Sequence, residues 1–210
     1  MQGPCGSCRG SLSCDGRFGL GSTAQASPLI QPGDAAPDFT ATDTAGRTMK
    51  LSQFAGKTVV LEWTNHDCPY VGKHYASGTM QELQKYAAAK DVVWLSVISS
   101  GPGQQGYVNG LEADKLTADR KAAPTAVLLD PEGKLGRLYG ATTTPHMFVI
   151  GSRGTLVYMG AIDDKPSSNP QSLKTARPYV REALDAVLAG KPVKTASSRP
   201  YGCSVKYGKS

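Results

Sequence analysis

The sequence has no apolar run long enough to cross a bilayer, which excludes a membrane-spanning helix. It also has no acidic residue in its last twenty positions, although five of its 23 Lys and Arg residues lie there. Without those five, 18 basic residues stand against 17 acidic ones, so all but one of the six net positive charges belong to the end of the chain. We therefore expect a solvated basic tail and no nucleic-acid partner.

Metal-binding and phosphate-binding patterns are also missing. Cys5, Cys8 and Cys14 have no fourth ligand at a matching spacing, and no histidine precedes His66, so a metal knuckle is disfavoured. The loop 101–106 has several glycines but lacks the lysine and spacing of a nucleotide loop, and it fits a flexible connection. The sequence implies no metal and no dissociable cofactor.

The segment before residue 30 is rich in Gly and Ser and has neither helical nor strand periodicity, so we expect it to be disordered or vestigial. Its residues 24–26 resemble the end of a secretory signal, but the apolar core of such a signal is missing. A truncated signal would place the protein in the periplasm or outside the cell, and otherwise it would be cytoplasmic. The compartment stays open.

The remaining 180 residues are enough for one well-buried domain. Two short strands around a turn are predicted within 39–51, and a hairpin is predicted from 144–150 and 155–159. Buried strands are predicted at 58–64, 92–98 and 125–129, and helices over 68–90, 111–121 and 180–188. The chain is thus a β-α-β-α-β sequence that ends in a hairpin and a helix.

Cys68 lies where the strand 58–64 gives way to a helix, directly before Pro69. The unpaired amides and dipole of a helix start stabilise a thiolate, so this is an address for a reactive cysteine. A dithiol motif would place its second cysteine at position 71, where the chain has Val71.

This order of elements, with a cysteine at a helix start and Thr144-Pro145 opening a hairpin, resembles the thioredoxin fold over residues 34–190. The resemblance implies an α/β fold with a central mixed sheet flanked by helices and an N-terminal β-hairpin extension. Residues 1–30 precede this domain, and residues 191–210 form a basic tail that carries Cys203.

Several motifs resemble the alkyl hydroperoxide reductase/thiol-specific antioxidant family, and in particular its peroxiredoxin-like members. They are the stretch 38–56, Cys68 to Val71, Thr144-Pro145, Ile162 to Asp164, and Gly202 to Lys206. The resemblance aligns Cys68 with the first cysteine of thioredoxin's Cys-x-x-Cys. Peroxiredoxins carry a threonine three residues and a proline seven residues before their peroxidatic cysteine, whereas Asn65 and Leu61 hold those places before Cys68. Peroxidase chemistry by the usual machinery is therefore disfavoured.

The resemblance also implies a substrate-binding surface. Pro145 aligns with the cis-proline that faces the active cysteine, and together with Thr144, Pro69 and Tyr70 it would receive an extended peptide or a mixed-disulfide partner. Glu62 lies at the spacing of thioredoxin's proton-relaying carboxylate. Its apolar neighbours predict a raised pKa, and an ion pair with Lys57 is the alternative.

Four further residues could influence the thiolate. His66 is favoured as a stabilising group, whereas the helical spacing predicts that Lys73 and His74 lie on the surface. His146 is expected on the surface of its strand.

A lone nucleophilic cysteine needs a second thiol to complete a two-electron cycle. Cys203 follows the last helix by about thirteen residues, which can span up to about 40 Å. We therefore expect a thiol-disulfide oxidoreductase in which Cys68 attacks and Cys203 resolves. The alternatives are a thiol peroxidase using Cys68 and a non-catalytic binding module. The substrate of the enzyme would be a protein or small-molecule disulfide or a peroxide. The sequence does not identify the thiol reductant.

Overall fold

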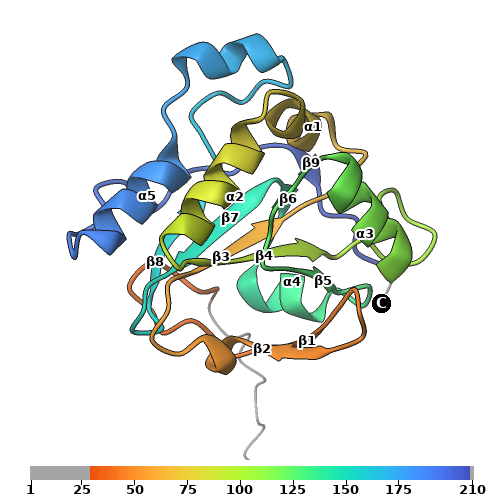
Figure 1. Ribbon diagram of the computed structural model, residues 1–210, viewed down its shortest axis with the longest axis horizontal. Coiled ribbons are helices and arrows are strands. Elements are labelled where there is room, and N and C mark those ends of the chain that lie inside the picture. The colour runs from red at the N-terminus through yellow and green to blue at the C-terminus, as the bar shows by residue number, and fades with distance from the viewer. Residues whose placement is uncertain (1–28, 209–210) are drawn as a thin grey trace, which may run out of the picture.

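The computed structural model describes residues 29–208. Its core is a seven-stranded sheet in the order β2-β1-β5-β4-β3-β7-β8, with helices on both faces (Figure 1). The strands are β1 (Thr40–Asp43), β2 (Thr48–Lys50), β3 (Val59–Trp63), β4 (Val93–Ile98), β5 (Ala126–Leu129), β7 (His146–Ile150) and β8 (Leu156–Gly160). The predicted mixed sheet flanked by helices is confirmed.

The centre of the sheet is parallel and its edges are antiparallel. Strands β3, β4 and β5 run parallel, whereas β7 is antiparallel to β3 and to β8. The predicted N-terminal hairpin is the pair β1–β2, which joins the same sheet because β1 is antiparallel to β5. All five residues of β3 are buried, as expected for a strand with both faces covered.

Within residues 29–208, five α-helices and two 3-10 helices accompany the sheet. They are α1 (Pro69–Ala76), α2 (Thr79–Ala89), α3 (Gly110–Asp119), α4 (Lys134–Tyr139), α5 (Tyr179–Leu188), η1 (Leu51–Phe54) and η2 (Pro170–Thr175). The expected helix from 68 to 90 is broken into α1 and α2 at Gly78, whose φ of +82° is left-handed and suits glycine. The helix α4 and both 3-10 helices were not predicted.

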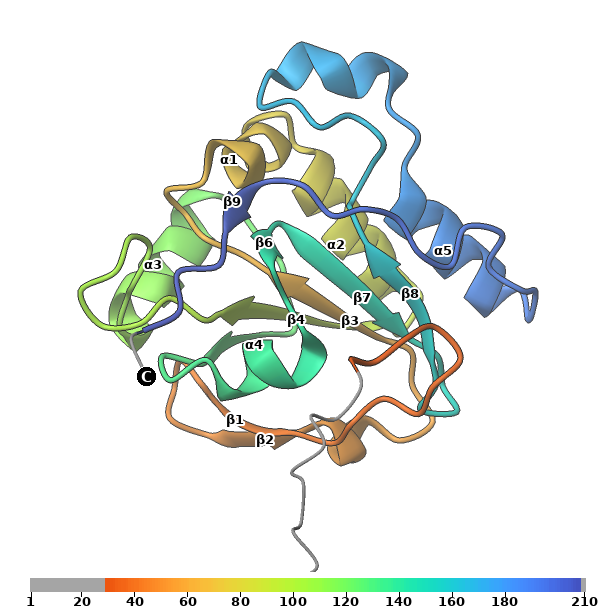
Figure 2. The same cartoon turned by 180° about the vertical axis from the view of Figure 1, so that it is seen from behind.

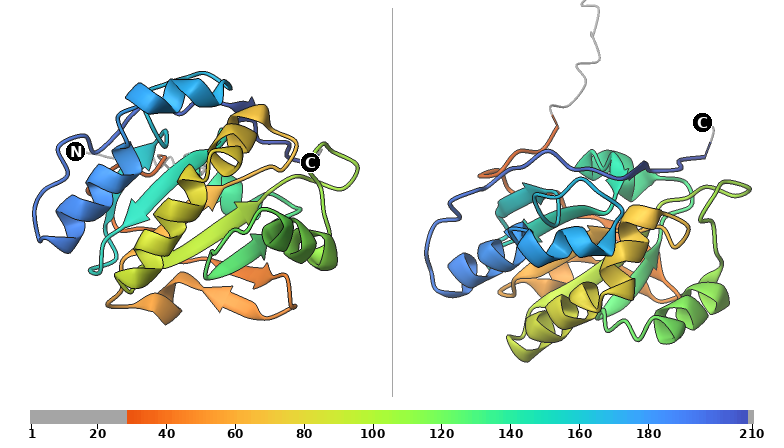
Figure 3. Two further views of the ribbon diagram at one scale, coloured as in Figure 1. Left: turned by 45° about the horizontal axis from the view of Figure 1, so that its top comes forward. Right: turned by 90° about the horizontal axis from the view of Figure 1, so that it is seen from above.

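The two faces of the sheet carry separate apolar clusters. Helices α2 and α5 lie side by side on one face (Figure 3) and bury Met80, Leu83, Val180 and Leu184 against it. Helix α4 covers the other face (Figure 2). There Tyr139 packs against Trp63 and Phe148 of the sheet, with ring centroids 5.8 and 5.6 Å away.

The chain after α5 turns back and crosses the molecule toward α4 (Figure 2). We call residues 191–208 the C-terminal strap. It runs beside β8 through a parallel bridge between Ser197 and Met159. It then forms β9 (Cys203–Ser204), which pairs antiparallel with β6 (Thr143–Thr144) in a second, two-stranded sheet. Sequence patterns predicted neither β6 nor β9.

Several sequence expectations concern the N-terminal segment. The metal knuckle, the signal-like motif and the disorder proposed for the N-terminus lie almost wholly outside the described residues. Between residues 29 and 208, no helix is long and apolar enough to cross a membrane.

Replacement of Phe148 by alanine tests the aromatic cluster. Phe148 is fully buried between Trp63 and Tyr139, so we expect F148A to lower the free energy of unfolding by about 3–5 kcal/mol. Leu111, which is 84% exposed, provides the control, and L111A should change this free energy by less than about 0.5 kcal/mol. Chemical denaturation of both variants measures the difference. Equal losses would contradict this description of the core.

Candidate active site

Cys68 lies at the start of α1, in the short loop that follows β3. It is the N-cap residue, and Pro69 follows it as the first helical residue. Proline suits this position because its missing N–H would have no partner in the first turn. Cys68 is only 1% exposed, and Val71, in the place of a second dithiol cysteine, is fully buried.

The loop before β7 faces Cys68. The Thr144–Pro145 peptide bond is cis, and the Cys68 thiol donates a hydrogen bond to the backbone carbonyl of Thr144 at 3.0 Å. The expected contact between the cysteine and the Thr-Pro loop is therefore present. The exposed Pro69 and the half-buried Tyr70 lie on the adjoining first turn of α1.

Cys203 reaches the same place from the other end of the chain. In the β6–β9 ladder it lies opposite Thr144, whose carbonyl is bound by Cys68. The two thiols lie close enough for each to shift the pKa of the other, and both are free. Cys203 is half-buried, so it is the more exposed of the two sulfurs.

The surroundings give the two sulfurs opposite acidities. Burial raises the pKa of Cys68, but the neighbouring Cys203 thiol, the Thr144 side chain and the backbone amide of Val71 stabilise the thiolate and outweigh burial, so the pKa falls below that of an ordinary thiol. The buried Thr144 hydroxyl has no hydrogen-bond partner in the thiol form of the site, so it is available to donate to a thiolate. Burial and the neighbouring Cys68 raise the pKa of Cys203 to about 11. Cys68 is thus the thiolate of the pair.

Glu62 is fully buried in β3, as predicted, but none of its hydrogen bonds goes to either thiol. Its carboxylate accepts hydrogen bonds from the side chains of Tyr75, Gln84, Trp94 and Ser96. Burial outweighs these bonds and raises the pKa of Glu62. The alternative ion pair is wrong, because Lys57 binds Asp91 at 2.7 Å.

The predicted surface positions of Lys73, His74 and His146 are wrong, because all three side chains are buried. Helical spacing indicates which residues share a face of α1, but the segment after β8 covers the face that carries Lys73 and His74. Burial lowers the pKa of His74 to about 3, assisted by the charge of Lys73. Burial also lowers the pKa of His146 to about 4. His66 pairs with Asp67 at 3.3 Å rather than with the thiol.

A polar cluster that sequence reasoning missed connects α1 with the strap. The Nζ of Lys73 lies 3.7 Å from the carboxylate of Asp163, which also accepts a hydrogen bond from the Tyr201 hydroxyl at 2.5 Å. Lys73 lies 4.9 Å from the centre of the Tyr201 ring, and Tyr70 contacts that ring edge-on. The motif Ile162 to Asp164 was the only signal of this cluster in the sequence.

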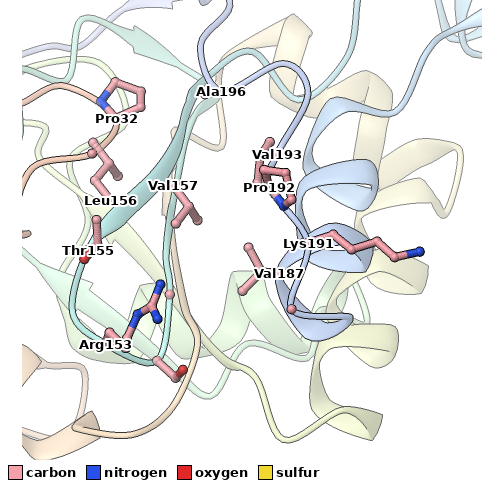
Figure 4. A pocket seen from close by; sticks show the side chains of 14 residues that line it. Pro32, Arg153, Thr155, Leu156, Val157, Val187, Lys191, Pro192, Val193 and Ala196 are labelled. Atoms are coloured by element: carbon pink, nitrogen blue, oxygen red, sulfur yellow. The ribbon is translucent and has the colours of Figure 1, made fainter.

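A groove on another part of the molecule is unrelated to the thiols. It measures about 660 Å³ and lies between the β7–β8 turn and the start of the strap (Figure 4). Arg153, Val157, Val187 and Lys191 are among its lining residues, and no cysteine is. In the part of the chain that the structure describes, no three His, Cys, Asp or Glu side chains are grouped to hold a metal ion.

Comparisons with known proteins agree with the fold. A family model described as the AhpC/TSA family matches residues 32–159. No curated protein matches the sequence.

Solved structures share the fold. An uncharacterised conserved protein from Geobacillus kaustophilus has 24% identity and a TM-score of 0.75, covering 87% of this chain and 95% of its own. A hypothetical protein from Sinorhizobium meliloti has 24% identity and a TM-score of 0.71, covering 87% and 98%. A candidate thiol:disulfide interchange protein, DsbE, from Chlorobium tepidum has 26% identity and a TM-score of 0.52, covering 78% and 98%.

Replacement of Thr144 by valine tests the stabilisation of the thiolate. Valine keeps the shape of the side chain but removes the hydroxyl, so T144V should raise the pKa of Cys68 by about 0.5–1 unit. The pH dependence of Cys68 alkylation, followed by peptide mapping, measures this pKa. T143V is the matched control, because the Thr143 hydroxyl binds the carbonyl of Pro145 instead. An equal shift in both variants would rule out the assigned role of Thr144.

The buried carboxyl of Glu62 predicts a pH dependence of stability. Its folded pKa is raised above the ordinary 4.5, so above that pH the native state holds a proton that the unfolded chain has lost. The contribution of the Glu62 carboxyl to the free energy of unfolding therefore falls as the pH rises from 4.5 toward the folded pKa. E62Q cannot ionise and should gain stability relative to the parent between pH 4.5 and 7. Urea unfolding at several pH values measures this, with the exposed E132Q as control. A constant difference between E62Q and the parent would disprove the raised pKa.

Proposed function

Because the chain belongs to the AhpC/TSA family, we propose that it is a thiol-disulfide oxidoreductase in which Cys68 attacks and Cys203 resolves. One observation carries the proposal: the β6–β9 ladder places Cys203 opposite Thr144, whose carbonyl binds the Cys68 thiol, so that the two sulfurs are neighbours although Val71 replaces the usual second cysteine. The likeness to the candidate thiol:disulfide interchange protein from Chlorobium tepidum supports the same class of reaction.

The proposed cycle begins at the more acidic sulfur. The Cys68 thiolate attacks one sulfur of a substrate disulfide, forms a mixed disulfide and expels the other sulfur as a thiolate. Cys203 then loses its proton and attacks the sulfur of Cys68, which expels the second substrate thiolate. The substrate disulfide is reduced to two thiols, and Cys68 and Cys203 become a disulfide. An external dithiol must reduce that disulfide to close the cycle.

The raised pKa of Cys203 is compatible with this order of steps. Part of the increase comes from the charge and hydrogen bonding of Cys68. In the mixed disulfide Cys68 has no charge and no proton, so that part disappears when Cys203 has to react. Lys206, two residues after Ser204, lowers the pKa of Cys203. Cys203 is therefore a poor nucleophile in the resting site and a better one after the first step.

A thiol peroxidase is the second candidate, and the family match is the observation that favours it. The residues around Cys68 argue against it. Asn65, in the place of the peroxiredoxin threonine, uses its side chain to bind the backbone at Asp67 and Gln105. Leu61 is part of the apolar core. Neither offers a hydroxyl to a peroxide.

The third candidate, a binding module with an inert structural thiol, agrees least with the site. A buried cysteine in purely apolar surroundings has a raised pKa. The hydrogen bonds at Cys68 instead leave its pKa lowered.

Oxidation of the protein tests the resolving role of Cys203. Cys5, Cys8 and Cys14 are first replaced by serine so that only the two site cysteines remain. We expect a disulfide donor to convert this parent chain fully to the Cys68–Cys203 disulfide, as seen by peptide mapping. With C203S added, the reaction should stop at one mixed disulfide on Cys68, and turnover should fall by at least about a hundredfold.

Two outcomes would contradict the proposal. One is the absence of a Cys68–Cys203 linkage after oxidation, and the other is turnover by C203S at the parent rate. Stopped-flow reaction of the reduced chain with hydrogen peroxide separates the second candidate, since oxidation of Cys68 at the rate of an ordinary thiol would exclude a dedicated peroxidase.

A further inference from the structure

The backbone edge beside Pro145, where the resemblance places an extended substrate, is occupied by the chain itself. Strand β9 pairs with β6 in the register Thr143 to Ser204 and Thr144 to Cys203. The amide of Val205 continues the pairing by donating to the carbonyl of Thr142 at 3.0 Å. An added polypeptide strand would find these groups already bonded.

The fit between the strap and this edge is close. Gly202 has a φ of +139° and lies directly on the backbone of Thr144, so that a Cβ at this position would collide with the Thr144 carbonyl. Only glycine allows both that conformation and that approach. The strap therefore meets β6 as a fitted surface.

Side chains and backbone hold the strap on either side of β9. Before β9, the hydroxyl of Tyr201 binds Asp163 and its ring contacts Lys73 and Tyr70. After β9, the hydroxyl of Tyr207 donates to the carbonyl of Ala141 at 2.7 Å. The carbonyl of Lys206 accepts from the amide of Gly101 at 2.8 Å.

We propose that the C-terminal strap is a built-in occupant of the extended-peptide edge, which makes Cys68 selective for small disulfides over polypeptide disulfides. This inference rests on the proposed oxidoreductase function. A polypeptide can lie along β6 only after β9 has been displaced and the contacts of Tyr201 and Tyr207 that hold the strap have been broken. A small disulfide needs less room, and on this proposal it reaches the sulfur of Cys68 past the half-buried Cys203 side chain while β9 stays paired.

The expected consequence is that large reagents react with Cys68 more slowly than small ones. A reagent that reacts only with the open form reacts more slowly in proportion to the fraction of molecules that are open. A reagent that reaches Cys68 in the closed form reacts at its full rate. The strap also affects the thiolate itself, because Cys203 lowers the pKa of Cys68, but that effect is common to both reagents and cancels in the ratio of the two rates.

Labelling of Cys68 tests the inference without requiring turnover. In a chain whose other four cysteines are serine, the rate of labelling by N-ethylmaleimide is compared with the rate for a maleimide carried in the middle of an unfolded polypeptide. G202A should force β9 off β6, because its new Cβ meets the Thr144 carbonyl. G190A is the matched control, since Gly190 also has a positive φ but open space around it.

The measured quantity is the labelling rate of the polypeptide reagent divided by that of N-ethylmaleimide. We expect this ratio to be at least about tenfold lower for the parent chain than for a free cysteine. G202A should raise this ratio about tenfold, and G190A should leave it unchanged. Y201F, which removes one anchor and no backbone contact, should shift the ratio in the same direction as G202A. Circular dichroism confirms that each variant is folded.

The inference is overturned if the parent chain shows the ratio of a free cysteine, or if G202A and Y201F both behave as G190A does. It is also overturned if N-ethylmaleimide cannot label Cys68 in the parent chain. These outcomes are distinct from failure of the proposed function, which would show as a missing Cys68–Cys203 disulfide whatever the labelling ratio.

Discussion

The site depends on the pairing of two very short strands, β6 and β9. Thr144 is shared by both halves of the site: its carbonyl binds the thiol of Cys68, and its backbone lies opposite Cys203. A slip of one residue in this register would turn the side chain of Cys203 to the other side of the strand. A ladder of two residue pairs is too short to hold a register alone. The glycine contact at Gly202 and the tyrosines on either side therefore determine where the second sulfur lies.

This pairing also explains why the two thiols differ chemically. Cys68 has the helix start, the Thr144 side chain and the Cys203 thiol around it, and each of them favours a thiolate. Cys203 lies on an edge strand next to that thiolate, so it keeps its proton. The buried sulfur is thus the better nucleophile and the accessible sulfur the poorer one. Movement of the strap becomes part of any reaction with a bulky partner.

The sequence predicted the sheet well because its strands are dense apolar runs and its longer helices have clear periodicity. Helix α4 has only six residues with a glycine among them, and β6 and β9 have two residues each, so none of these has enough residues to show a period. Cys68, its place at a helix start and its contact with the Thr144-Pro145 loop could be inferred from local pattern and resemblance. That Cys203 could reach Cys68 followed from chain length alone. The contact itself could not be predicted, because it depends on how the strap packs.

The orientation of α1 shows the same limit and explains what the strap is fixed to. Periodicity places Lys73 and His74 on particular faces of α1, but only the tertiary structure brings Asp163 against them. On another face of the helix, Tyr75 donates to the buried Glu62 at 3.0 Å.

The fully hydrogen-bonded network around Glu62 thus holds α1 toward the sheet, and such a network is costly to disrupt. The ion pair of Lys73 with Asp163 also holds α1 toward the segment after β8. Cys68 is accordingly on the rigid side of the site. Cys203 lies on a two-residue edge strand that is held mainly by hydroxyl and backbone contacts, so it belongs to the less stable part of the fold. The change in geometry between the free thiols and a disulfide should therefore be absorbed by the strap, while α1 and the Thr144-Pro145 loop keep their positions.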